Sequence, residues 1–169
     1  MSNHIINNEF YNWVTSIKSL NLKSKSVLIV GFGYMGKEYF KALSKMGIKN
    51  ISIIALRDNG YQGKNILIGS YEKIAQYEKK DLVVLTLPTK LLVPAAKLAV
   101  KNGQKNILIE KPGALDQKEL EKLKKFKNVH IKIAYNRLFY PNLHKLKKLV
   151  KQDGGITSCN FSFTEWIHK

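Results

Sequence analysis

A short apolar stretch that runs directly into three spaced glycines constrains the fold of this chain more than any other feature. Val27–Val30 has the length and composition of a buried strand, and Gly31, Gly33 and Gly36 follow it in the spacing G-x-G-x-x-G. An amphipathic segment over 34–46 comes next and predicts a helix. A strand, a glycine turn and a helix in this order predict a site for the pyrophosphate of a dinucleotide; a tight turn without a ligand is the alternative.

Each glycine of the turn has its own physical role. Gly31 can take the sharp turn out of the strand, and Gly33 lets the backbone approach a pyrophosphate because it has no Cβ. Gly36 lets the new helix pack against the strand. The first N–H groups of that helix, together with the positive end of its dipole, would face the phosphates.

The length and composition of the chain fit one domain, or one domain with part of another. Its 169 residues are 44% hydrophobic, which is enough for a packed core. The longest apolar runs are strand-sized and far short of the ~20 residues of a membrane helix, and Met1–Trp13 lacks the features of a signal peptide. The single cysteine, Cys159, has no partner for an internal disulfide. We therefore expect a cytoplasmic protein without a membrane segment.

The formal net charge of +17 comes almost entirely from lysines. Arg57 and Arg137 are the only arginines, and the lysines are spread along the whole chain without interleaved aromatic residues. Because nucleic-acid platforms combine basic residues with aromatic stacking partners, the pattern favours lysines on solvated helix faces over a nucleic-acid or other polyanion surface. The four histidines lack metal-ligand spacing, so no metal site is predicted.

Strand-like and helix-like segments alternate along the chain. The predicted strands lie at 26–30, 50–56, 65–68, 81–87, 106–109 and 130–134, and the predicted helices at 34–46, 71–79, 91–101 and 116–126. This alternation indicates an α/β fold, a doubly wound parallel sheet with helices on both faces. A further amphipathic helix is predicted at Asn8–Leu20, ahead of the first strand.

A second motif, Glu110-Lys111-Pro112, comes directly after the apolar segment Asn106–Ile109. Ligands of doubly wound sheets bind at the carboxyl ends of the strands, so the motif is predicted to lie at the ligand edge. A lysine beside a cationic nicotinamide ring would lose its proton more readily, which suits Lys111 to proton transfer. An exposed loop lysine without a catalytic role is the alternative.

Together the two motifs resemble the Gfo/Idh/MocA family of oxidoreductases. The resemblance extends over Ser26–Arg137 and includes Thr86-Leu87-Pro88 and Ala134-Tyr135-Asn136-Arg137. It implies a Rossmann fold and an enzyme that moves a hydride between NAD(P) and a carbon bearing a sugar or cyclitol hydroxyl.

The resemblance also implies roles for single residues. Lys111 would act in proton relay, and Glu110 would lie near the nicotinamide ribose. Leu87 and Pro88 would lie along the cofactor, and Asn136 near its nicotinamide end. A cis peptide bond is expected at Lys111-Pro112. The pyrophosphate would be held by Gly31, Phe32, Gly33, Tyr34, Met35 and Gly36.

Two departures from the family pattern bear on the cofactor site. Leu91-Leu92 stand where many members have a histidine, which removes one polar contact. At the end of the second predicted strand, Arg57 precedes Asp58. A guanidinium suits the 2'-phosphate of NADP, whereas a carboxylate suits the ribose hydroxyls of NAD. The sequence therefore favours NADP and leaves NAD open, with a surface role for Arg57 as the alternative.

The chain is shorter than family members, which carry a second domain that binds substrate. We expect an N-terminal helical extension over 1–24, an NAD(P)-binding domain over 25–138, and a linker helix with the start of a truncated domain over 139–169. Its predicted strand, Ile156–Ile167, has an apolar face that a second copy could cover, which predicts a homo-oligomer. Two functions compete: the cofactor-binding half of a dehydrogenase for a small sugar-like substrate, inactive alone, and a stand-alone nucleotide-binding or redox-sensing module.

Overall fold

A computed structural model describes residues 21–58, 65–160 and 162 of the chain. The described residues fall into two units, one that extends to Tyr135 and a smaller one from Asn136 onward. The predicted helix at 8–20 lies outside the described residues. Within the described ranges, no helix combines the length and the apolar character needed to cross a bilayer.

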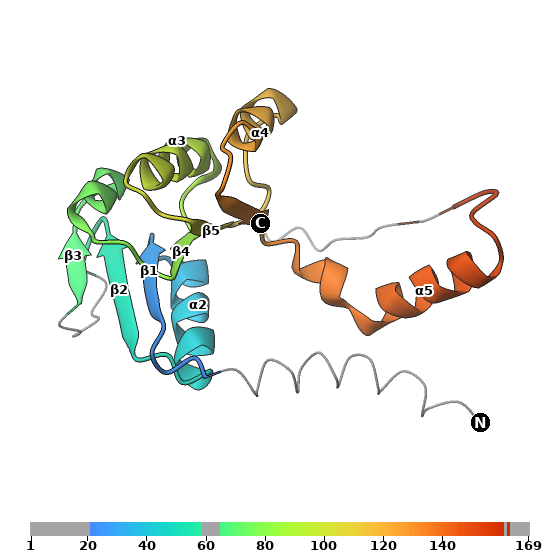
Figure 1. Ribbon diagram of the computed structural model, residues 1–169, viewed down its shortest axis with the longest axis horizontal. Helices are drawn as coiled ribbons and strands as arrows, with labels where there is room; N and C mark the ends of the chain where they lie inside the picture. The colour runs from blue at the N-terminus through green and yellow to red at the C-terminus, as the bar shows by residue number, and fades with distance from the viewer. Residues whose placement is uncertain (1–20, 59–64, 161, 163–169) are drawn as a thin grey trace. The chain divides into compact units, whose positions relative to one another are not determined.

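Six parallel strands form the sheet of the larger unit, in the order β3-β2-β1-β4-β5-β6 (Figure 1). The chain adds strands to one side of β1 and then returns to add the rest on the other side. This is the doubly wound, Rossmann-type sheet predicted from the sequence, and it has its topological switch point between β1 and β4. The strands are β1 (Ser26–Val30), β2 (Asn50–Ala55), β3 (Ile66–Ile68), β4 (Leu82–Leu85), β5 (Asn106–Ile109) and β6 (His130–Ile133).

α-Helices make three of the connections between consecutive parallel strands. Helix α2 (Tyr34–Lys45) joins β1 to β2, α3 (Thr89–Lys101) joins β4 to β5, and α4 (Gln117–Lys124) joins β5 to β6. The side chain of Asp116 caps α4 by accepting a hydrogen bond from the N–H of Glu119, at 2.8 Å.

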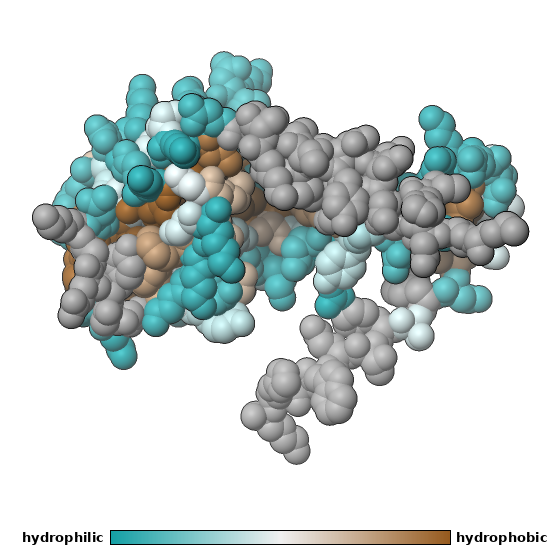
Figure 2. All heavy atoms as spheres, turned by 90° about the horizontal axis from the view of Figure 1, so that it is seen from below, coloured by the Kyte–Doolittle hydropathy of each residue, from teal (hydrophilic) through white to brown (hydrophobic). Residues whose placement is uncertain are grey.

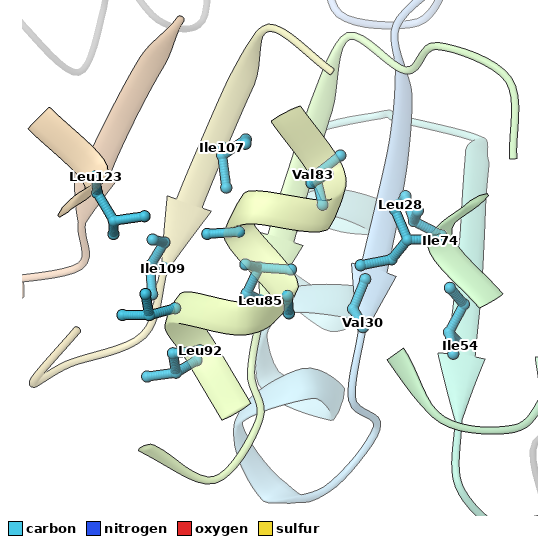
Figure 3. Packing of buried hydrophobic residues seen from close by; sticks show 14 of the residues in the cluster. Leu28, Val30, Ile54, Ile74, Val83, Leu85, Leu92, Ile107, Ile109 and Leu123 are labelled. Carbon is cyan, nitrogen blue, oxygen red and sulfur yellow. The ribbon is translucent and has the colours of Figure 1, made fainter. Parts of the chain in front are cut away.

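Alternate side chains of β1 pack on opposite faces of the sheet. Leu28 and Val30 belong to a buried cluster that includes residues of α3 and α4, whereas Val27 and Ile29 belong to a second cluster that includes Leu43 of α2. Figure 3 shows the first cluster, where apolar side chains from β1, β2, β4 and β5 meet Leu92 of α3. Two apolar faces explain why the strands read as nearly continuous hydrophobic runs.

One predicted helix is replaced by a tighter turn. The segment 71–79 was expected to be helical, but the structure has the 3-10 helix η1 (Tyr71–Gln76), and Tyr77 has extended backbone angles. Its apolar residues, Tyr71, Ile74 and Tyr77, are three positions apart and all contact the first cluster. This spacing matches the three residues per turn of a 3-10 helix, and Ile74 is completely buried.

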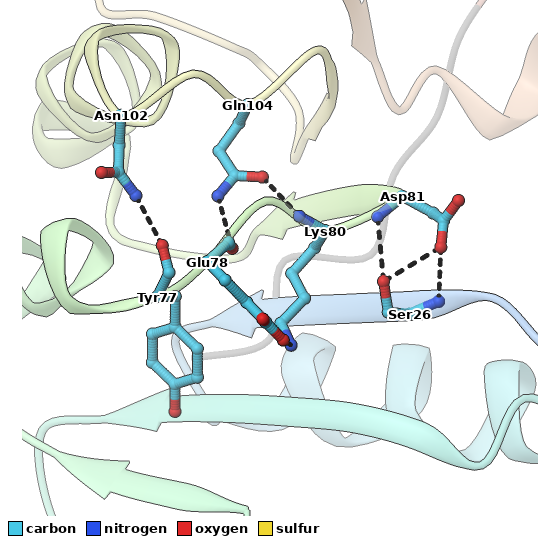
Figure 4. A network of polar contacts seen from close by, with 7 residues as sticks. All are labelled: Ser26, Tyr77, Glu78, Lys80, Asp81, Asn102 and Gln104. Atoms are coloured by element: carbon cyan, nitrogen blue, oxygen red, sulfur yellow. Dashed lines mark hydrogen bonds and ion pairs between the residues drawn. The ribbon is translucent and has the colours of Figure 1, made fainter.

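A polar network ties the opposite, amino-terminal ends of the strands together (Figure 4). Asp81, just before β4, accepts hydrogen bonds from the N–H and hydroxyl of Ser26 at 2.8 and 2.9 Å and pairs with Lys25 at 3.0 Å. The buried side chain of Gln104 accepts from the N–H of Lys80 and donates to the carbonyl of Glu78. The connection into β4 is thus fixed to β1 on one side and to the loop before β5 on the other.

The smaller unit contains the 3-10 helix η2 (Asn136–Phe139) and the helix α5 (Pro141–Gln152), which is the predicted linker helix. The strand expected over 156–167 is not formed at 156–160 or 162, and its other residues lie outside the described ranges. An isolated strand has no ladder hydrogen bonds to hold it, which accounts for the difference.

Much of the visible surface of the larger unit carries hydrophilic side chains with apolar residues between them (Figure 2). The lysines of α2 and α4 are all exposed. This agrees with the interpretation of the lysines as residues of solvated helix faces.

Candidate dinucleotide-binding site

The register of the sheet places the two sequence motifs side by side. Val30 of β1 is aligned with Leu85 of β4, and Leu85 is aligned with Ile109 of β5. The residues that follow, Gly31, Thr86 and Glu110, therefore leave neighbouring strands at the same edge. Backbone hydrogen bonds continue the ladder here, from the N–H of Thr86 to the carbonyl of Val30 and from the N–H of Glu110 to that of Leu85, both at 2.9 Å.

Two glycines of the turn are required by packing. Gly31 has a φ of +96°, and a Cβ added to it would lie 2.5 Å from the carbonyl oxygen of Thr86. A Cβ at Gly36 would overlap the carbonyl oxygen of Gly31 and lie 3.0 Å from Oγ1 of Thr86. No side chain fits at either position, so these glycines make the sharp turn and the close contact of α2 possible.

Gly33 differs from the other two, because packing does not require it. Its backbone angles, φ −74° and ψ −159°, suit any residue, and an added Cβ would meet nothing within 4 Å. Gly33 is the N-cap of α2, where no side-chain hydrogen bond caps the helix and the first turn carries no acidic residue. The space in front of the first N–H groups of α2 is therefore open.

This open space fits a pyrophosphate. The first N–H groups of a helix have no partner within the helix, and here the first intrahelical bond runs from Lys37 to the carbonyl of Gly33, at 3.1 Å. The N–H groups of Tyr34, Met35 and Gly36 precede it and can donate to an anion. The Phe32 side chain is 4% exposed and packs in the core, which leaves only its backbone for a ligand.

Thr86 holds the glycine turn from the neighbouring strand. Its Oγ1 donates a hydrogen bond to the carbonyl oxygen of Gly31 at 2.7 Å. Sequence reasoning included Thr86 in the family resemblance but not among the site residues. Its position directly after β4, the strand that pairs with β1, could have indicated that it lies beside the glycine turn.

The Glu110-Lys111-Pro112 motif is held from two sides. The Tyr39 hydroxyl of α2 donates to Oε1 of Glu110 at 2.9 Å, and the N–H of Lys111 donates to Oε2 at 3.2 Å. The Tyr135 hydroxyl donates to the carbonyl oxygen of Pro112 at 3.2 Å. The Lys111-Pro112 peptide bond is cis, which confirms the expectation from the family resemblance.

Burial and charge differ between the two ionisable residues of the motif. Glu110 is only 9% exposed, whereas Lys111 is exposed at the edge of the sheet. Burial, followed by the hydrogen bond to Glu110 and its charge, raises the pKa of Tyr39. The Tyr39 hydroxyl therefore keeps its proton at neutral pH and remains a donor to Glu110.

The other predicted residues lie as follows. Pro88 is the N-cap of α3, and its carbonyl accepts from the N–H of Leu91 at 2.8 Å. Leu87 packs against the first cluster, and the exposed Arg57 follows β2 at the same edge of the sheet. Asn136 begins η2 in the smaller unit. In the part of the chain that the structure describes, no group of three or more acidic, histidine or cysteine side chains could hold a metal ion.

The fold and the glycine turn define a dinucleotide-binding Rossmann domain. Residues 25–135 match the model of the Gfo/Idh/MocA oxidoreductase family, which is described as having an NAD-binding Rossmann fold. The match covers more than half of the 169 residues, and the chain belongs to this family.

Solved structures of similar fold include several dehydrogenases. A scyllo-inositol dehydrogenase from Lactobacillus casei with bound NAD(H) and scyllo-inositol has a TM-score of 0.65 at 19% identity, over 78% of this chain and 42% of that one. A myo-inositol 2-dehydrogenase from Lactobacillus plantarum has a TM-score of 0.66 at 21% identity, over 77% and 42%. An NAD-binding protein from Listeria innocua has 0.62 at 23% identity, over 78% and 41%.

These identities support the shared fold alone. The aligned part is about two fifths of the length of each of these structures. No curated protein matches the chain.

Proposed function

We propose that this chain is the cofactor-binding half of an NAD(P)-dependent dehydrogenase that acts on a hydroxyl-bearing carbon of a sugar or cyclitol. One observation supports the proposal most strongly. The open space in front of the first N–H groups of α2 at Gly33, here called the pyrophosphate cradle, lies at the same edge of the sheet as the motif Glu110-Lys111-Pro112. The substrate class is the one that the family resemblance implies, and two inositol dehydrogenases are among the structures of similar fold.

In this proposal, different residues bind the cofactor and transfer the proton. The backbone N–H groups of the first turn of α2 would hold the pyrophosphate, and Leu87 and Pro88 would contact the cofactor. When bound, the nicotinamide ring supplies the acceptor or donor of the hydride. Lys111 takes the hydroxyl proton at Nζ as the alcohol is oxidised and returns it in the reverse direction. Glu110 would lie at the nicotinamide end of the site.

Arg57 supports a preference for NADP. It follows β2 at the edge that carries the glycine turn, and its guanidinium can pair with a 2'-phosphate through two hydrogen bonds. We expect Arg57→Ala to weaken NADPH binding by about tenfold or more, since charge-assisted bonds are lost, and to leave NADH binding unchanged. Lys105→Ala, at the opposite edge of the sheet, is the matched control for one lost charge. Clearly tighter binding of NADH than NADPH by the unaltered chain would contradict the preference.

We also propose that the chain self-associates through its C-terminal region. Leu138, Leu146, Leu149 and Ile156 of the smaller unit are each about half exposed or more. Equilibrium sedimentation is expected to show a dimer or larger species, and Leu146→Lys with Leu149→Lys is expected to convert it to monomer. A monomer for the unaltered chain at all concentrations would contradict the proposal.

Proton release tests the role of Lys111 without requiring turnover. The oxidised nicotinamide ring is cationic and the reduced ring is neutral, so binding NAD(P)⁺ next to Lys111 should expel a proton from Nζ, and binding NAD(P)H should not. Calorimetry in buffers of different ionisation enthalpy measures this release. Lys111→Met is expected to abolish it, and Lys105→Met to leave it unchanged. Equal release by Lys111→Met and the unaltered chain would refute the relay, and binding without release would favour a nucleotide-binding module.

A further inference from the structure

The carboxylate of Glu110 is engaged on both of its oxygens within the protein. One oxygen accepts from the Tyr39 hydroxyl at 2.9 Å and the other from the N–H of Lys111 at 3.2 Å. Glu110 is 9% exposed, and its own N–H is bound to the carbonyl of Leu85. The buried carboxylate therefore connects helix α2, through Tyr39, to the backbone N–H of Lys111.

Tyr39 belongs to the helix that begins at the pyrophosphate cradle. It lies six positions after Gly33, and its ring packs beside the second core cluster. A helix of this length moves as one body, so the cradle at its N-terminus and the Tyr39 hydroxyl are held at a fixed separation. The hydrogen bond to Glu110 extends this fixed relation to the N–H of Lys111.

We propose that Tyr39 is a positioning residue that ties the pyrophosphate-binding helix to Lys111 through the Glu110 carboxylate. The inference rests on the proposed function for the role of Lys111 in proton relay. Tyr135 fixes the Pro112 end of the motif by donating to the Pro112 carbonyl. Tyr39 fixes the Lys111 end, because it holds the carboxylate that accepts from the N–H of Lys111.

Tyr39→Phe tests the inference because it removes the hydroxyl and keeps the ring that packs in the core. Without the hydroxyl, Oε1 of Glu110 loses its donor, and the carboxylate can turn away from Lys111. We expect the amide signal of Lys111 in a ¹H–¹⁵N spectrum of the cofactor-free chain to shift, and its hydrogen exchange to become about tenfold faster. Tyr77→Phe is the matched control, since the Tyr77 hydroxyl donates to the carbonyl of Ile53, away from the motif.

A double variant separates the connection through Glu110 from a general loss of stability. If Tyr39 acts through Glu110, then Glu110→Met, which has no oxygen to accept from Tyr39, and Tyr39→Phe together should change the Lys111 amide no more than Glu110→Met alone. Additive changes would show that Tyr39 acts by another route. An unchanged Lys111 amide in Tyr39→Phe would overturn the inference.

The cofactor arm of the experiment keeps this inference apart from the proposed function. In the unaltered chain, saturating NADH is expected to shift the Lys111 amide, and in Tyr39→Phe this shift should be reduced severalfold. If the unaltered chain binds neither NADPH nor NADH, the proposed function fails, and the cofactor-free spectra still decide whether Tyr39 positions Lys111. If NADH shifts the amide equally in both proteins, the tie to the pyrophosphate-binding helix is refuted.

Discussion

At the scale of single residues, the three glycines of the turn do different things. Gly31 and Gly36 are required by the fold, because a side chain at either position would overlap backbone atoms. Gly33 has ordinary backbone angles and open space around it. In the spacing G-x-G-x-x-G, the first and third glycines are therefore needed for packing, and the second leaves space for a ligand.

This difference predicts opposite effects of the same small substitution. Gly36→Ala should lower the free energy of unfolding by about 1–3 kcal/mol, the usual cost of overpacking. Gly33→Ala should leave it within about 0.5 kcal/mol, as for an unconstrained surface change. Urea unfolding followed by circular dichroism measures both free energies. Equal destabilisation by the two substitutions would contradict the different packing of Gly33 and Gly36.

Some residue-level features follow from the sequence and others do not. The packing roles of Gly31 and Gly36 and the cis bond at Lys111-Pro112 were predictable, because they depend on backbone geometry or on a motif. The hydrogen bond between Tyr39 and Glu110 was not, because it joins side chains 71 positions apart that only the folded sheet brings together. The same holds for Thr86, whose partner, Gly31, follows another strand.

At the scale of elements, the strands and most of the helices follow from hydrophobic patterning, since runs of buried residues occupy both faces of the sheet. The described residues hold two exceptions. The strand predicted over 156–167 is not formed at 156–160 or 162, and the segment predicted as a helix over 71–79 forms the 3-10 helix η1. Periodicity over so short a segment does not separate an α-helix from a 3-10 helix, and packing against the sheet decides.

Helix α3 shows how tightly an element can be fixed to the sheet. Ala95, Ala96 and Ala99 are completely buried, so small side chains set the distance between α3 and the strands. Ala96→Leu should destabilise the protein by about 1–3 kcal/mol through overpacking. Lys97→Leu, on the exposed side of the same helix, is the control and should change the stability little. Thermal unfolding compares the two, and similar melting temperatures would contradict the described packing.

At the scale of the whole molecule, the carboxyl and amino ends of the parallel strands carry different kinds of residues. The carboxyl edge carries the glycine turn and the Lys111 motif, and the amino edge is closed by polar contacts such as those of Asp81 with Ser26 and Lys25. Substitutions at the amino edge should therefore change stability without changing cofactor binding.

The amino edge predicts how stability depends on pH. The backbone N–H of Ser26, with help from Lys25 and the Ser26 hydroxyl, lowers the pKa of Asp81 from 3.8 to about 2. Because the folded-state pKa is the lower one, Asp81 stabilises the protein fully above about pH 4 and loses this effect as the pH falls toward 2. Asp81→Asn should thus be less stable than the unaltered chain at pH 7, and the difference should shrink near pH 2. Urea titrations at both pH values check this, and a difference independent of pH would contradict it.

The central claim is that the open cradle at Gly33 binds a dinucleotide. Calorimetric titration of the chain with NADPH and with NADH tests it most directly, with Gly33→Ala as the matched variant that keeps the fold. The account predicts saturable binding of at least one cofactor by the unaltered chain, weakened about tenfold or more in Gly33→Ala, since a methyl group would stand where the phosphates approach the backbone. No binding of either cofactor, or equal binding by the folded Gly33→Ala variant, would contradict it.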